Sequence, residues 1–123
     1  MKFYYNDQLI RTSKNHEYTH AVIVIDENGK IGCIGCRRSL QEAEALKQGE
    51  INGYRNGIDN CNKAIKALQE GKSGYYVRDR RKDWFIKFED GRTPAYYEEI
   101  IDAKRRTIKN IEDTWQVVEL EAR

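Results

Sequence analysis

An aromatic ring and a cation share one segment of the chain, the five residues WFIKF that begin at Trp84. If this segment is a β-strand, Trp84, Ile86 and Phe88 face the core. Phe85 and Lys87 then face the other way. A phenyl ring beside cations can stack on a purine while the cations hold phosphate, whereas burial under a loop or a second subunit is the alternative. We predict that Phe85 stacks on a base.

Basic side chains gather on the last predicted helix. Arg105 and Lys109 are one turn apart on a common face, and Arg106 flanks them. Such a patch is often just a solvated helix face. We predict instead that this helix lies beside the Phe85 strand and that its three cations hold phosphate.

Two further segments combine arginine with other groups that bind anions. Arg92 and Thr93 stand at a predicted helix entry, where free N–H groups favour an anion, although two glutamates in the next turn oppose it. Arg11, Thr12 and Ser13 follow a predicted strand and offer a guanidinium and two hydroxyls. Both segments are candidate contacts for phosphate or ribose.

The pair Cys33 and Cys36 has the spacing of metal-binding or redox cysteines. On a regular strand, positions three apart point to opposite faces, so the two thiolates can share a metal only if a bulge intervenes. The other candidate ligands are His16, His20 and Cys61. We therefore predict small buried strand cysteines, without a metal or a cofactor.

The composition predicts one globular domain spanning residues 1–123, with 34% charged and 39% apolar residues. Its net charge of +2 gives no general reason to expect binding to long nucleic acid or to a membrane. No apolar run is long enough to span a bilayer, and the amino terminus lacks the features of a signal peptide. Three cysteines, an odd number, are typical of a reducing compartment, so we expect a cytoplasmic protein.

Local patterns predict the elements that must position these side chains. Two amino-terminal hairpins are expected, the second with a type I′ turn at Asn28-Gly29. Ser39 predicts the start of a long helix that ends before Gly71, and Thr93 with Pro94 predicts a second helix. The expected strands and helices cover residues 2–5, 8–11, 17–25, 30–36, 39–70, 74–78, 84–88 and 93–121. The predicted class is α+β: amino-terminal antiparallel hairpins form a sheet, two long helices pack on each other and on it, and a short strand pair lies between the helices.

Both predicted helices carry an apolar seam with alternating spacings of three and four residues, which favours packing of one helix on the other. In the second helix a lysine interrupts the seam, which comprises Tyr97, Ile101, Lys104, Ile108, Ile111, Trp115 and Val118. The first helix has a matching seam of Ile51, Tyr54, Ile58, Cys61, Ile65 and Leu68.

A second face of the first helix is lined by glycines spaced four residues apart, Gly49, Gly53 and Gly57, although each glycine costs a helix about 1 kcal/mol. Such a ridge allows another backbone to approach closely, either within the monomer or across a subunit interface. Polar side chains stand around it and could line a pocket where subunits meet. They include Arg55, Asn56 and Asn60.

The opening FYYNDQLIRTSKNHEYTHAVIV, followed by a hairpin, a long helix, short aromatic strands and a closing helix, resembles the small phage Thoeris anti-defence proteins of the first family described. The resemblance implies a sponge rather than an enzyme, which sequesters the glycocyclic ADP-ribose signal made by bacterial TIR-domain proteins. It also implies dimers or higher oligomers with ligand pockets between subunits. Some members hold cyclic oligonucleotides as well.

Other classes of function remain open at the level of sequence. A protein-binding inhibitor of a defence enzyme, of the anti-CRISPR or anti-restriction type, would use the same charged helices. An enzyme that cleaves a nucleotide signal is a third possibility, with His16 as its base, but neither histidine has the setting of a catalytic triad. No glycine-rich phosphate-binding motif is present.

Overall fold

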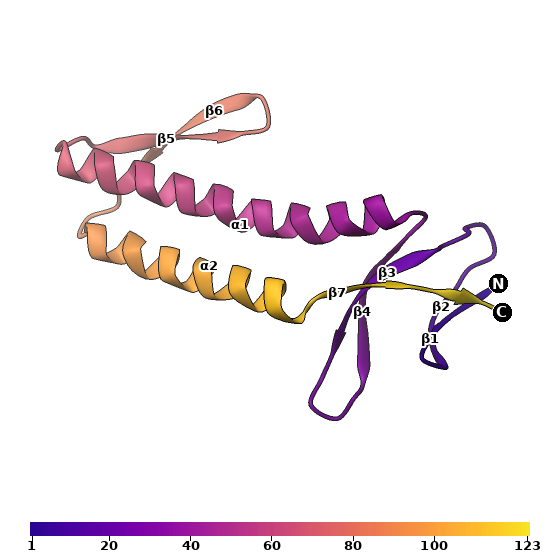
Figure 1. Cartoon of the computed structure of the whole chain (residues 1–123). Helices are drawn as coiled ribbons and strands as arrows, with labels where there is room; N and C mark the ends of the chain where they lie inside the picture. Colours follow the sequence, from indigo (N-terminus) through magenta and orange to yellow (C-terminus); the bar gives the residue numbers. More distant parts are fainter. The chain divides into compact units, whose positions relative to one another are not determined.

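A computed structural model describes all residues from 1 to 123 and confirms the predicted α+β class (Figure 1). Two helices and eight strands follow one another in the order β1 (Lys2–Tyr5), β2 (Gln8–Thr12), β3 (His20–Ile25), β4 (Ile31–Arg37), α1 (Leu40–Gln69), β5 (Gly74–Asp79), β6 (Lys82–Lys87), α2 (Pro94–Thr114), β7 (Gln116–Glu119) and β8 (Glu121–Ala122). Neither helix combines the length and the apolar character needed to cross a membrane.

The chain divides into two compact units, each of which contains part of both long helices. The first unit comprises residues 1–51 and 109–123, and the second comprises residues 52–108. The first unit holds two three-stranded sheets, with strand orders β2-β1-β8 and β4-β3-β7. The second unit holds the two-stranded sheet of β5 and β6, which is the short strand pair predicted between the helices.

The two chain ends lie side by side in the first unit (Figure 1). The Lys2 N–H donates to the Arg123 carbonyl at 3.1 Å, and the Arg123 N–H donates to the Lys2 carbonyl at 2.8 Å. The first hairpin turns at Asn6 and Asp7, whose φ angles of 46° and 61° are the left-handed values that a two-residue turn requires. The tight turn predicted there is confirmed.

The turn of the second hairpin differs from the predicted type I′ turn, which needs positive φ at two central residues. Gly29 has a φ of 79°, but Asn28 is not in the left-handed region. Instead, one side-chain oxygen of Asp26 accepts the N–H groups of Asn28 and Lys30 at 2.9 and 2.8 Å. The aspartate organises a longer turn because its carboxylate satisfies backbone donors inside the loop.

A bulge interrupts the pairing of β3 with β4. Val22 pairs with Gly35, but the next residue, Ile23, pairs with Cys33, so Ile34 is one extra residue on β4. Gly35 also allows α1 to approach the sheet closely, since a Cβ atom there would lie 2.9 Å from a methyl carbon of Leu46. The glycine therefore serves both the bulge and the packing of the helix.

The bulge changes where the two neighbouring cysteines point. Cys33 pairs with Ile23 and Cys36 pairs with Ala21, and alternation along β3 places both partners on one face. The two Sγ atoms are 3.8 Å apart. The prediction that these thiols point to opposite faces was therefore wrong, because it assumed a regular strand.

The closing helix is shorter than predicted. It ends at Thr114, and residues 116–122 form strands β7 and β8 instead of helix. The Lys47 ammonium donates to the Trp115 carbonyl at 2.8 Å, which satisfies an acceptor just beyond the helix end. The following residues include two adjacent valines, which favour a strand, and Val118 and Leu120 are buried on either side of the exposed Glu119. The extension to Glu121 was wrong because a helical spacing was counted through a β-type run.

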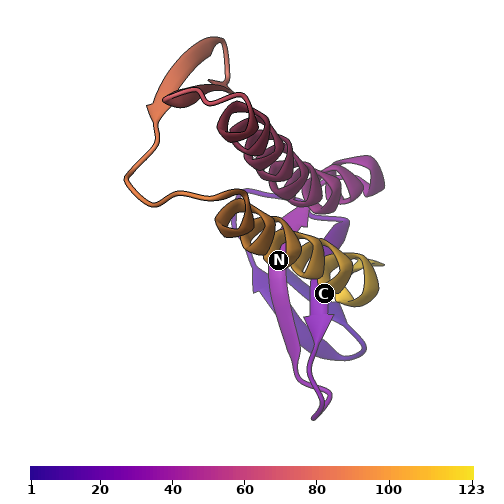
Figure 2. The same cartoon turned by 90° about the vertical axis from the view of Figure 1, so that its left-hand side faces the viewer.

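In the second unit α1 and α2 run side by side (Figures 1 and 2). Cys61 of α1 packs with Tyr97 and Ile101 of α2, as the apolar seams predicted, and Ala64, which was not part of the predicted seam, is buried with them. Lys104, which interrupts the seam, lies against Gly57, since a Cβ atom at that glycine would be 2.9 Å from the lysine Cε. The absence of a side chain at this one glycine thus makes room for the lysine stem.

Candidate ligand-binding pocket

The end of α1 builds one wall of a pocket in the second unit. Gly71 adopts a φ of 72°, and its N–H donates to the Leu68 carbonyl at 3.1 Å, while the Lys72 N–H donates to the Ala67 carbonyl at 2.9 Å. This pair of bonds is a Schellman motif, with Gly71 at the helix end that the sequence predicted. It stops the helix sharply, so that Lys72 and the residues after it lead directly into β5.

One face of the last two turns of α1 carries the basic groups of the pocket. Lys63, Lys66 and Glu70 fall three to four residues apart and therefore share a face. Beyond the helix end, Lys72 pairs with Glu70 at 2.9 Å. The hydrogen bond from Lys72 lowers the pKa of the Glu70 carboxyl, so Glu70 remains an anion at neutral pH. Of the three lysine ammonium groups that line the pocket, the one of Lys72 is therefore already paired with a carboxylate.

Two aromatic rings from the β5–β6 hairpin face one another across the strands. Tyr76 pairs with Phe85 in the register, and their ring centroids are 5.1 Å apart. Tyr76 is 64% exposed and Phe85 is 50% exposed, although buried rings are the normal outcome for residues of this size. The exposed aromatic surface is therefore available to a ligand.

Gly74 makes room for the Phe85 ring. A Cβ atom at position 74 would lie 2.5 Å from the Phe85 Cζ atom and would also collide with the Ile86 carbonyl oxygen. Real Cβ atoms do not approach other atoms so closely. The position of Phe85 therefore depends on a glycine at the start of β5.

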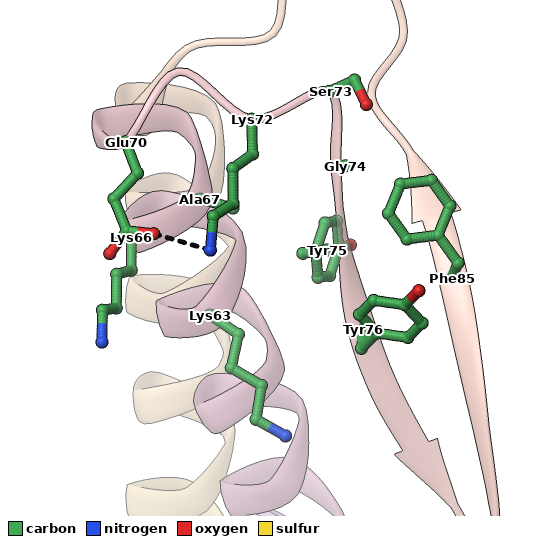
Figure 3. Close-up of a pocket in the computed structure, with 10 residues that line it drawn as sticks. All are labelled: Lys63, Lys66, Ala67, Glu70, Lys72, Ser73, Gly74, Tyr75, Tyr76 and Phe85. Atoms are coloured by element: carbon green, nitrogen blue, oxygen red, sulfur yellow. Dashed lines mark ion pairs between the residues drawn. The ribbon is translucent and has the colours of Figure 1, made fainter.

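Together these groups line a pocket of about 610 Å³ within the second unit (Figure 3). Its ten lining residues come from the end of α1 and from the hairpin: Lys63, Lys66, Ala67, Glu70, Lys72, Ser73, Gly74, Tyr75, Tyr76 and Phe85. Figure 3 shows the lysines on the helix side and the rings of Tyr76 and Phe85 on the hairpin side. Ammonium groups suit phosphate, rings suit a base, and hydroxyls suit ribose.

Of the residues predicted from sequence to contact a ligand, Phe85 alone lines this pocket. Alternation along β6 places it on the face opposite Trp84 and Ile86, as predicted. Trp84 and Ile86 were expected in the core, but they are 50% and 41% exposed, and only Phe88 packs against it. The core-facing side of the hairpin is instead supplied by Tyr75, which packs on Phe88 and Tyr97.

The cations predicted to lie beside Phe85 are not the ones found there. Arg105 and Arg106 are exposed on α2 and do not line the pocket. Lys109 is exposed as well and pairs with Asp113 at 3.0 Å. The sequence indicated the right kind of group, but it did not indicate that α1 would supply the cations.

Arg92 belongs to a smaller pocket of about 280 Å³ in the second unit. Its guanidinium donates to Glu89 at 2.7 Å and lies 4.0 Å from the centroid of the Tyr96 ring. Thr93 starts α2, and its carbonyl accepts the Tyr96 N–H at 3.1 Å. Since Arg92 is already neutralised by Glu89, this helix entry is a weaker anion site than its sequence predicted.

The predicted segment of Arg11, Thr12 and Ser13 lies in the first unit. Thr12 pairs with Lys2 at the end of the first hairpin. The Ser13 hydroxyl accepts the His16 N–H at 3.0 Å, and the Ser13 carbonyl accepts the amino-terminal ammonium at 2.8 Å. These groups close the hairpin, and they do not line the pocket beside Phe85.

The glycine ridge points largely to open space. A Cβ atom at Gly49 or Gly53 would meet nothing within 4 Å, whereas Gly57 is covered by Lys104. The alternative of a close crossing inside the monomer is therefore wrong for the first two glycines. The polar residues predicted around the ridge lie on α1 and do not line the pocket: Arg55, Asn56 and Asn60.

Sequence reasoning missed Lys63, Lys66, Lys72 and Tyr76. A signal was present, because Lys63 and Lys66 share a helix face just before a glycine that ends the helix. The direction in which the hairpin returns past the helix depends on tertiary contacts, so the sequence pattern could not place Tyr76 beside these lysines.

Comparison of the chain with known protein families, with curated proteins and with solved structures finds no match.

Proposed function

We propose that this protein is a phage anti-defence sponge, which binds and sequesters a cyclic ADP-ribose-type immune signal in the host cytoplasm and leaves it uncleaved. The observation that carries the proposal is the pocket in which the exposed rings of Phe85 and Tyr76 lie beside three lysines. The resemblance of the amino-terminal segment to the Thoeris anti-defence family supports the same class of ligand.

The chemistry of the pocket matches the parts of such a signal. Two linked phosphates call for ammonium groups, an adenine calls for a stacking ring, and two riboses call for hydroxyl partners such as Ser73. The volume of about 610 Å³ lies within the range of about 300 to 1,000 Å³ that small-molecule sites occupy. The same groups could hold cyclic oligonucleotides, which share phosphate and base.

A sponge needs tight binding and slow release, and neither requires acid–base chemistry. The pocket is open to solvent on the isolated chain, where water weakens charge-assisted bonds. A second copy of the chain that covered the rings would exclude this water and slow the release of ligand. We therefore propose a dimer or higher homo-oligomer, in line with the outward-facing Gly49 and Gly53.

Gly53→Leu tests this self-association. The new side chain has open space in the monomer, so we expect the variant to keep its helical circular dichroism. If the glycine ridge contacts another subunit, the leucine keeps the two backbones apart, and light scattering will show a smaller mass than for the wild type. A wild type that is monomeric throughout the micromolar range contradicts the proposed oligomer.

Phe85→Ala tests the stacking ring. Loss of one base-stacking contact, worth about 1 to 3 kcal/mol, should weaken binding of glycocyclic ADP-ribose by about five- to 150-fold in calorimetry. Phe85→Trp should retain most of the affinity because it keeps an aromatic face. The matched control is Trp84→Ala, which removes an equally exposed ring from the opposite face of β6.

Melting temperatures measured on the same variants distinguish stacking from a purely structural role. Removal of a half-exposed ring should lower the free energy of unfolding by much less than the about 3 to 5 kcal/mol that removal of a buried phenylalanine costs. A large drop in melting temperature for Phe85→Ala, with unchanged affinity in the fraction that remains folded, would assign the ring to the fold instead.

A protein-binding inhibitor of a defence enzyme is the second candidate function. It is favoured by the exposed apolar surface on the other face of the hairpin, where Trp84 is 50% and Ile86 is 41% exposed. Such an inhibitor would take up no nucleotide, and Trp84→Ala would abolish its activity while Phe85→Ala would not. If the protein is a sponge, Phe85→Ala weakens its activity and Trp84→Ala does not.

A further inference from the structure

Two thiols meet in the first unit, whereas the residues assigned above to ligand binding belong to the second unit. The Sγ atoms of Cys33 and Cys36 are 3.8 Å apart, which is close to van der Waals contact. The bulge at Ile34 places both side chains on the same face of β4.

The two thiols differ in their access to solvent. Cys36 is 2% exposed and belongs to the core cluster with Ala21 and Ile23, whereas Cys33 is half-buried at its edge. Burial, together with the neighbouring Cys33, raises the pKa of the Cys36 thiol to about 11, although Arg11 and Arg37 act in the opposite direction. Cys36 is therefore a protonated thiol at neutral pH, and Cys33 is the one that a reagent can reach.

We propose that Cys33 and Cys36 form a redox-active dithiol, which a low-molecular-weight disulfide such as oxidised glutathione converts to an intramolecular disulfide. The third cysteine, Cys61, lies in the second unit and is buried without a thiol neighbour. It supplies an internal control for reactivity that depends on the pair.

The exchange proceeds in two balanced steps. Cys33 loses its thiol proton to solvent, and the resulting thiolate attacks one sulfur of oxidised glutathione, which forms a mixed disulfide and releases one glutathione thiolate. Cys36 then gives up its proton to solvent or to the released thiolate, and its sulfur attacks the Cys33 Sγ, which breaks the mixed disulfide and releases the second glutathione. The two protein thiols are oxidised and one glutathione disulfide is reduced to two thiols.

Mass spectrometry of the full-length protein tests this reaction directly. Trypsin cuts after Lys30 and Arg37, so both thiols fall in the single peptide IGCIGCR, while Cys61 falls in another. The folded protein is treated with oxidised glutathione, unfolded in acid, alkylated and digested. We expect the peptide to be about 2 Da lighter than the unmodified dithiol and to carry no alkyl group, with alkylation restored by dithiothreitol.

The Cys61 peptide should remain alkylated in the same sample, and Cys61→Ala should leave the reaction of the pair unchanged. Cys33→Ala should prevent formation of the disulfide and leave Cys36 available to alkylation after unfolding. The proposal is overturned if IGCIGCR from the oxidant-treated wild type carries two alkyl groups, retains a bound glutathione, or is linked to a peptide of another chain. Ligand binding plays no part in this test, so its outcome is independent of the proposed function.

Discussion

Replacing Lys63 and Lys66 together by alanine is expected to weaken the binding of glycocyclic ADP-ribose by about 10²- to 10⁴-fold. These two lysines share a face of α1 and line the pocket beside Phe85, and neither is paired as Lys72 is with Glu70. Charge-assisted hydrogen bonds to phosphate contribute about 1.5 to 3 kcal/mol each. Calorimetry at low ionic strength measures the loss, and the wild-type affinity should fall as salt is added.

The matched control removes two cations of α2, Arg105 and Lys109, by alanine substitution. Both are exposed, and neither lines the pocket. The affinity should then change little beyond a general effect of net charge. If this control loses its affinity while the Lys63 and Lys66 variant keeps it, the phosphate is held on α2, as the sequence alone had suggested, and the pocket assignment is wrong.

Gly74→Ala is expected to lower both the melting temperature of the protein and its affinity for the ligand. The added methyl group collides with the Ile86 carbonyl and with the Phe85 ring, and a backbone carbonyl in a strand pair cannot move aside without breaking the pairing. Overpacking of this kind costs about 1 to 3 kcal/mol, and a backbone contact belongs at the upper end. Thermal unfolding should therefore show a drop of about 10 °C in melting temperature.

Gly49→Ala is the control for the glycine substitution itself. A Cβ atom at that position would have no neighbour within 4 Å, so alanine should stabilise the monomer by about 0.5 to 1 kcal/mol.

Phe85 cannot keep its position beside an alanine at position 74, so ligand affinity should fall even in the Gly74→Ala molecules that remain folded at low temperature. A Gly74→Ala protein with wild-type melting temperature and affinity would show that Phe85 does not depend on this glycine.

Features that depend on local backbone chemistry could be predicted from the sequence. Ser39 starts α1, where its hydroxyl accepts the Glu42 N–H at 3.1 Å, and Gly71 ends it. Asn6 and Asp7 form the first turn for the same kind of reason. In each case a residue type satisfies a backbone requirement within a few positions of itself.

Features that depend on pairing with distant strands could not be predicted from the sequence. Residues 116–122 become strands because β3 and β1 offer them free edges, and their helical spacing does not reveal those partners. The bulge at Ile34 reverses the direction of Cys33, which a regular alternation cannot anticipate. The chemistry of the candidate pocket was predictable through Phe85, but the lysines beside it depend on how the hairpin folds back along α1.

The central claim is that the protein holds a cyclic ADP-ribose-type signal and leaves it intact, and recovery of the bound ligand tests it most directly. Purified protein is incubated with glycocyclic ADP-ribose, separated from free ligand and heat-denatured, and the released nucleotide is analysed by liquid chromatography and mass spectrometry. The sponge predicts that ligand is retained on the native protein and released with its mass and retention time unchanged. Recovery of a hydrolysed nucleotide faster than in buffer, or no retention of ligand at all, would contradict the account.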